Sequence, residues 1–151
     1  MYHPWLLDPE AAQQVAAECE SAGLDVDARI VNSDGAQIGT QQGIRVYGNS
    51  HGFVGSYAST RHSLSCVLIG EDANGMQRDY WYTVARSADE LESAVHVGQK
   101  AGARTVARLA PKKAPTGTFP IMLAPQLASG LIGHLLGAIS GGAQYRKASF
   151  L

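Results

Sequence analysis

The chain has little cysteine and almost no net charge. Two of its 151 residues are cysteine, and the formal net charge is -1. Two cysteines far apart in the sequence do not indicate a disulfide framework, which favours a reduced, cytoplasmic protein. A net charge near zero provides no global attraction to nucleic acid or to anionic membranes. We therefore expect a cytoplasmic protein with no membrane partner and no direct nucleic-acid partner.

Targeting and membrane-spanning segments are also missing. The first five residues contain no basic region followed by an apolar stretch, so they do not form a signal peptide. Residues 119–143 carry no Asp, Glu, Lys or Arg and contain a Gly-x-x-x-Gly pair, as some membrane helices do. However, Pro120 and Pro125 interrupt this segment early, and polar residues dilute the remainder. A buried strand over residues 119–124 and a buried helix from Pro125 onward are the better interpretation.

Helix and turn signals predict the elements of the first two thirds of the chain. Asp8 can cap a helix over residues 9–22, and Gly23 is a natural stop. Asp-Gly at residues 34–35 and Asn-Gly at residues 74–75 favour hairpin turns, and the Gly-Asn-Ser-His-Gly sequence at residues 48–52 indicates a further turn. Short turns at these intervals predict an antiparallel meander of four strands. The expected strands are residues 28–32, 44–47, 53–69 (irregular near Ser59) and 76–85.

A second helix is expected after the meander. Ser87 and Glu90 form a capping box, and a stripe of small apolar residues follows as far as Leu109. Gly98 and Gly102 in this stripe would allow another backbone to approach closely. The opposite face is basic, and we interpret it as a solvated face because no aromatic residues are interleaved with the cations. That face carries Lys100, Arg104 and Arg108, and Lys112 and Lys113 continue the basic strip after the helix.

The fold class that these patterns predict is α+β. An antiparallel meander flanked by helices forms a central domain at residues 1–113, and a Pro- and Lys-rich segment then leads into a second domain. Residues 114–151 supply the first strand and helix of that second domain. The glycines of this last helix, among them Gly133, Gly137 and Gly141 in a row on one side, weaken it by roughly 1 kcal/mol each relative to alanine, so it needs a packed neighbour.

Several stretches resemble the TldD/PmbA family of peptidases. They lie at residues 43–52, 59–66, 76–83 and 133–147. The family's catalytic members read His-Glu-x-x-x-His in the last region, where this chain has Ser129, Gly130 and His134. The resemblance is thus to the PmbA, or TldE, subunit. It covers the central part of that subunit plus the start of its C-terminal domain.

The resemblance implies a role in peptide proteolysis within a heterodimer. In that family, zinc sits in a TldD-like subunit, and the assembly cleaves unfolded or short peptides. This chain is then expected to hold no cofactor and no metal, and to be inactive alone. Members have also been described as modulators of DNA gyrase, but no DNA-binding motif is visible here. The alternative is a non-enzymatic partner-binding or scaffold module, in which the meander pairs with a partner's sheet edge.

His134 is the candidate metal ligand of the chain. Zinc needs several nitrogen, sulfur or oxygen ligands, and hydrolysis usually needs a carboxylate to handle the proton of bound water. Ser129 and Gly130 supply neither, so we expect His134 to be a buried, hydrogen-bonded residue. An autonomous peptidase would instead require a carboxylate from another element, with Asp89, Glu90 and Glu92 as the available residues.

The other possible site residues favour structural roles. We interpret His51 and His62 as surface or hairpin-edge residues rather than ligands. Cys66 lies four residues after His62, which on a strand is about 13 Å, too far for a catalytic pair. Trp81 is expected on the sheet face opposite to Tyr80 and Tyr82, so that one face is core and the other can meet a partner.

Overall fold

The computed structural model describes residues 2–150, and the chain divides into two compact units after Lys112. The first unit is α+β, as predicted: a three-stranded antiparallel sheet flanked by helices. Its elements are α1 (Pro9–Leu24), β1 (Ile30–Gly48), β2 (Val54–Asp72), β3 (Gly75–Ala85), a 3-10 turn (Ala88–Glu90) and α2 (Ala94–Ala107). The second unit contains α3 (Pro125–Ile139) and α4 (Gly141–Tyr145).

The sheet has three strands rather than the predicted four. The Asp34-Gly35 pair does not turn the chain but forms a β-bulge within β1. Ser33 pairs with Leu68 and Gly35 with Val67, so Asp34 is an extra residue on its strand. Gly35 has a φ of 104°, which a bulge can use as well as a hairpin turn can. The prediction of a hairpin here was therefore wrong, because the same residues serve both structures.

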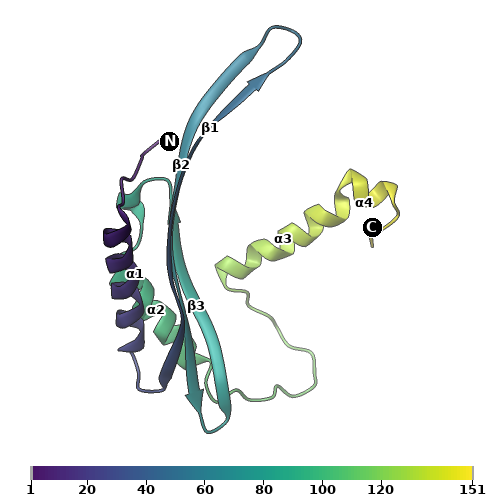
Figure 1. The fold of residues 1–151 in the computed structure, drawn as a ribbon. Coiled ribbons are helices and arrows are strands. Elements are labelled where there is room, and N and C mark those ends of the chain that lie inside the picture. Colours follow the sequence, from purple (N-terminus) through teal and green to yellow (C-terminus); the bar gives the residue numbers. More distant parts are fainter. Residues whose placement is uncertain (1, 151) are drawn as a thin grey trace. The chain divides into compact units, whose positions relative to one another are not determined.

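The two hairpin turns, between β1 and β2 and between β2 and β3, lie where predicted. The first turn is the tip of a long two-stranded projection. The Asn49 side chain accepts hydrogen bonds from the backbone N–H groups of His51 and Phe53. From there, β1 and β2 pair without the irregularity expected near Ser59. β3 joins β2 only from His62 onward, so residues 41–61 project beyond it as a two-stranded arm (Figure 1).

α1 and α2 cover one face of the sheet (Figure 1), and the glycines at their contact are essential to it. As predicted, Gly98 and Gly102 allow close approach: a Cβ at Gly102 would lie 2.7 Å from the carbonyl oxygen of Gly23. Gly23 does not stop α1, which continues to Leu24. Its role is packing, since a Cβ there would lie 2.9 Å from the carbonyl oxygen of Gly98. The core beneath consists of Cys19, Ile30, Leu64, Cys66, Leu68, Val97 and Ala101.

The helix starts differ in how well the sequence predicted them. Asp8 caps α1 as expected, accepting a hydrogen bond from the Ala11 N–H at 2.7 Å. The Ser87 capping box was wrong, because Ser87 makes no side-chain cap hydrogen bond and α2 is capped by Ser93. The intervening chain is held to the sheet instead, where the Glu92 N–H donates to the Thr83 hydroxyl at 3.2 Å.

The basic face of α2 is not simply solvated. Arg104 and Arg108 both make ion pairs with Asp79 of β3, whose side chain is 7% exposed. The ammonium of Lys100 lies 3.7 Å from the centre of the Trp81 ring. Trp81 packs against the core while Tyr80 and Tyr82 stack on the other face, as predicted. These cations therefore fasten α2 to the sheet.

In the second unit, the helix from Pro125 was predicted but its surroundings were not. Residues 119–124 form no strand and are exposed. Most of α3 is exposed as well, including its large apolar side chains. The predictions of a buried strand and a buried helix both assumed that another segment covers these apolar side chains. The described residues of this unit do not cover them. None of the helices in the described chain has the length and hydrophobicity to cross a membrane.

Candidate functional site: an arginine-lined hollow at the base of the arm

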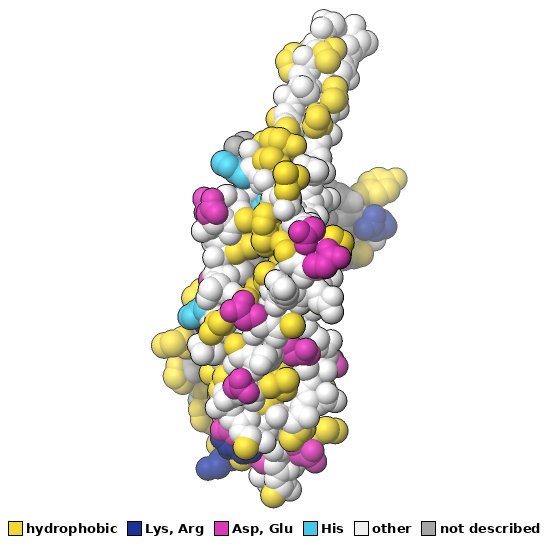
Figure 2. Space-filling model, turned by 60° about the vertical axis from the view of Figure 1, so that its left-hand side comes forward, with side chains coloured by type: hydrophobic (Ala, Val, Ile, Leu, Met, Phe, Trp, Pro, Cys, Tyr) yellow, Lys and Arg dark blue, Asp and Glu magenta, His cyan; other side chains and the backbone are white. Residues whose placement is uncertain are grey.

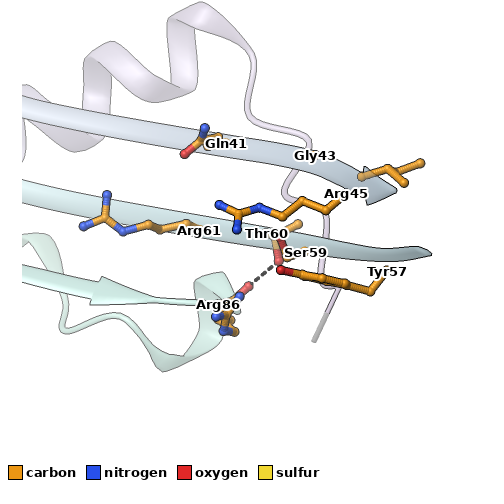
Figure 3. Close-up of a pocket in the computed structure, with 9 residues that line it drawn as sticks. Gln41, Gly43, Arg45, Tyr57, Ser59, Thr60, Arg61 and Arg86 are labelled. Atoms are coloured by element: carbon orange, nitrogen blue, oxygen red, sulfur yellow. Dashed lines mark hydrogen bonds between the residues drawn. The ribbon is translucent and has the colours of Figure 1, made fainter. Parts of the chain in front are cut away.

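The sheet face that carries no helices presents two arginines at the base of the arm. Side chains alternate along a strand, so residues whose partners are known can be assigned to faces. Gln41 pairs with Arg61, and Arg45 pairs with Tyr57. These four residues lie on the face opposite to the buried Leu64 and Leu68. Figure 3 shows the Arg45 side chain pointing back along the sheet toward Gln41 and Arg61.

A third arginine is added by the chain that leaves β3. Arg86 directly follows the last residue of that strand, Ala85. The Thr60 hydroxyl donates to the Arg86 carbonyl oxygen at 2.7 Å, the dashed line in Figure 3. This bond ties the backbone of Arg86 to β2 where sheet pairing with β3 has ended. The three arginines thus come from β1, from β2 and from the segment after β3.

The arginines line a hollow of about 330 Å³. Its other lining residues are Gln41, Gly43, Ile44, Tyr57, Ser59 and Thr60, none of which is a carboxylate. Within residues 2–150, no ion pair engages Arg45, Arg61 or Arg86. Three uncompensated guanidinium groups make the hollow positive in potential, although the net charge of the chain is near zero.

A buried polar cluster supports the hollow from the other face of the sheet. His62 is fully buried, so its interpretation as a surface residue was wrong. Its Nε2 donates to the His3 carbonyl oxygen at 2.9 Å, which leaves Nδ1 to accept from the Thr40 hydroxyl at 2.9 Å. The His3 N–H in turn donates to the Thr60 hydroxyl at 3.0 Å. The N-terminal segment is thereby fixed beneath the arm.

His134, the candidate metal ligand from the sequence, lies on α3 and is exposed. The expectation of a buried, hydrogen-bonded histidine was therefore wrong for the described chain. The Ser129 hydroxyl donates to the Gln126 carbonyl oxygen at 3.5 Å, and Gly130 has no side chain to offer. No group of three His, Cys, Asp or Glu residues that could hold a metal occurs in the part of the chain that the structure describes. The donors around His134 do not fit zinc.

The remaining candidates from the sequence are not brought together. His51 is exposed in the arm turn. The Cys66 thiol is hydrogen-bonded to Cys19 rather than placed next to His62, and both thiols are free and buried. The carboxylate of Glu92 accepts from the Trp81 indole N–H at 3.1 Å. The structure thus gives Cys66 and Glu92 structural partners and leaves His51 exposed.

Comparison with known proteins identifies the family. Residues 2–109 match the model of the PmbA/TldA metallopeptidase central domain. The chain belongs to this family. It is 44% identical over its whole length to the metalloprotease PmbA of Escherichia coli O157:H7 and 43% identical to a PmbA homologue of Haemophilus influenzae. In both cases it spans 34% of the relative's length.

Solved structures agree with this PmbA-type fold. A crystal structure from Bacteroides thetaiotaomicron, titled as a candidate modulator of DNA gyrase, matches 99% of the chain and 35% of its own length. The TM-score is 0.87 and the sequence identity 27%. A second structure, of a Thermotoga maritima protein with a similar description, matches 74% of the chain and 25% of its own length. Its TM-score is 0.67 at 19% identity, which shows the fold alone.

Sequence reasoning missed the arginine hollow of this PmbA-family chain. Arg45, Arg61 and Arg86 are separated by 16 and 25 residues, and none forms a recognisable motif. Their proximity depends on the register of the arm and on the point at which β3 ends. The predicted turn at residues 48–52 does not by itself fix the register of its two strands, and it is the pairing of residue 45 with residue 57 that places Arg45 and Arg61 on one face.

Proposed function

We propose that this chain serves in a TldE-type subunit of a cytoplasmic, TldD–TldE-type metallopeptidase. In this proposal a TldD-like partner carries the zinc and performs hydrolysis, and the heterodimer acts on unfolded or short peptides. This chain holds no metal and is inactive alone. Residues 1–113 act as the central domain of the subunit, and residues 114–151 begin its C-terminal domain.

The observation that carries the proposal is the chemistry of α3. Ser129 and Gly130 stand where the catalytic members of the family have a histidine and a glutamate. Neither residue can replace an imidazole ligand together with a carboxylate base. His134 alone leaves most of the coordination sphere of zinc to be filled. The membership of the chain in a metallopeptidase family and this loss of donors together favour a supporting subunit.

The arm provides a second line of support. Its apolar side chains are unusually exposed, with Ile44 at 72%, Val54 at 75% and Val46 at 68%. Figure 2 shows hydrophobic side chains along the arm on the face in view. Apolar surface of this kind is typical of an interaction site. An arm that a partner subunit covers accounts for it.

Reconstitution with a TldD-like subunit tests the proposal. The two proteins are purified separately and together, and hydrolysis of an unfolded polypeptide is measured. We expect activity only from the complex, with His134→Ala in this chain leaving it unchanged. Hydrolysis by this protein alone that disappears with His134→Ala, while the circular dichroism spectrum stays native, would contradict the proposal.

The exposed arm also favours a second candidate function, a partner-binding or scaffold module without any enzymatic role. The same preparation distinguishes the two functions. A stable complex that hydrolyses no peptide, although the TldD-like subunit is loaded with zinc, would support the scaffold. Partner-dependent hydrolysis would support the peptidase subunit.

A further inference from the structure

We propose that the arginine-lined hollow binds a carboxylate group of a peptide. The proposal rests on the proposed function in that it takes peptides as the ligands. It adds a recognition site on this chain, at a distance in sequence from α3. The residues assigned to it are Arg45, Arg61 and Arg86, with Gly43 as the open floor of the hollow.

The charge of the hollow is the first argument. The guanidinium group presents several N–H donors in a planar fork that matches the two oxygens of a carboxylate. Other arginines in the first unit have such partners: Arg29 pairs with Asp27, Arg78 with Asp34, and Arg104 with Asp79. Among the described residues, the three arginines of the hollow have none. An external carboxylate would form with these arginines the ion pairs that Asp27, Asp34 and Asp79 form with the other arginines.

The shape of the hollow is the second argument. Gly43 lies between Gln41 and Arg45 on β1 and faces the hollow, opposite Ser59 of β2. A Cβ built at Gly43 meets no heavy atom within 4 Å. The missing side chain therefore leaves open space between the arginines, into which a ligand group can descend. The fold itself does not require glycine at this position, because Gly43 is not among the glycines with positive φ.

The surroundings favour a peptide as the source of the carboxylate. Arg45 and Tyr57 also line a second hollow farther along the arm, together with Tyr47 and Gly55, which lie on the same strand face. A basic site that continues into an aromatic surface suits a chain with a charged group and hydrophobic neighbours. A free inorganic anion would contact the arginines alone and would not extend into the second hollow.

The test measures binding in the protein without its partner, so that catalysis is not involved. The probes are a short apolar peptide with a free C-terminal carboxylate, the same peptide amidated at its C-terminus, the amidated peptide with one internal Glu, and inorganic phosphate. Calorimetry gives Kd for each. We expect the free-acid peptide to bind roughly tenfold or more tightly than the uncharged amide. The Glu peptide distinguishes a side-chain carboxylate from a terminal one.

Matched variants assign the effect to the hollow. Arg45→Ala and Arg61→Ala should each remove the preference for the carboxylate, whereas Arg78→Ala, on the same sheet face but paired with Asp34, should preserve it. Arg45→Lys should restore it only in part, since lysine lacks the planar fork. Gly43→Val should weaken binding by filling the hollow while every charge remains.

Three results would refute carboxylate binding in the hollow. Equal Kd values for the acid and amide peptides, or a preference that survives Arg45→Ala and Arg61→Ala in natively folded protein, would refute it. So would tighter binding of inorganic phosphate than of any carboxylate peptide. If the hollow does not bind carboxylates, partner-dependent hydrolysis can still be observed. If no partner-dependent hydrolysis is found, the Kd values still report on the hollow, so the two proposals are tested separately.

Discussion

Gly98→Ala tests the packing of the two helices on which the sheet and its arm depend. Gly98 lies on α2 where that helix meets α1. A Cβ at this position would fall within the van der Waals surface of the Cys19 carbonyl oxygen and 3.0 Å from the Gly23 nitrogen. Both atoms belong to the backbone of α1, so no side-chain rotation can relieve the overlap. The helices must separate, and the core between them must open.

Two opposing effects determine the sign of the change. Replacing glycine by alanine inside a helix stabilises it by about 1 kcal/mol through propensity. Overpacking a well-packed core costs about 1–3 kcal/mol, and a backbone clash lies at the upper end of that range. The net loss should be about 2 kcal/mol, which corresponds to a decrease in Tm of about 8 °C for a unit of this size.

Thermal unfolding followed by circular dichroism measures the effect. Gly133→Ala on α3 is the matched control, because a Cβ there meets nothing within 4 Å. That substitution should leave the first unit unchanged and stabilise its own helix by up to about 1 kcal/mol. A Tm for Gly98→Ala equal to or above that of the unchanged protein would refute the close approach of α1 and α2.

The remaining predictions concern charges and thiols of the first unit. Asp79→Ala, which strips the arginines of α2 of a buried partner, should lower the free energy of unfolding in urea by about 2 kcal/mol; no loss would contradict the ion pairs. Hydrogen bonds from Arg29 lower the pKa of Asp27 to about 2, so the stability it contributes is present above the ordinary value of 3.8 and lost as the pH falls toward 2. An NMR titration should find this midpoint, and Arg29→Ala should raise it. The hydrogen bond with Cys66 and burial raise the pKa of the Cys19 thiol, whereas the hydrogen bond from Cys19 lowers the pKa of the Cys66 thiol. Both thiols are fully buried, so iodoacetamide at neutral pH should label neither cysteine until denaturant is added; labelling of the native protein would contradict their burial.

The sequence predicted features that depend on local chemistry. Asp8 caps its helix, the Asn-Gly pair turns the chain before β3, and Gly98 and Gly102 lie at a helix contact, because each follows from a residue and its near neighbours. Asp34-Gly35 was misread because positive φ at glycine is compatible with both a turn and a bulge. Local chemistry alone does not decide between them; the pairing partner on β2 does.

The candidate site shows the same limit of local reasoning. His134 can be selected as a candidate from the sequence alone, because it lies in a segment that resembles a known motif. Arg45, Arg61 and Arg86 acquire meaning only through strand register and through the point at which β3 ends beside the arm. Burial of the apolar residues of α3 was expected from their pattern, yet such a pattern does not say which segment covers them.

The zinc content of the protein, measured by inductively coupled plasma mass spectrometry, distinguishes a supporting subunit from one that carries the metal itself. The protein is purified alone and as a complex with a TldD-like subunit, with His134→Ala as a parallel sample. We expect no stoichiometric zinc in the protein alone and one zinc per complex, unaffected by His134→Ala. One zinc per chain in the protein alone, lost with His134→Ala, would contradict it.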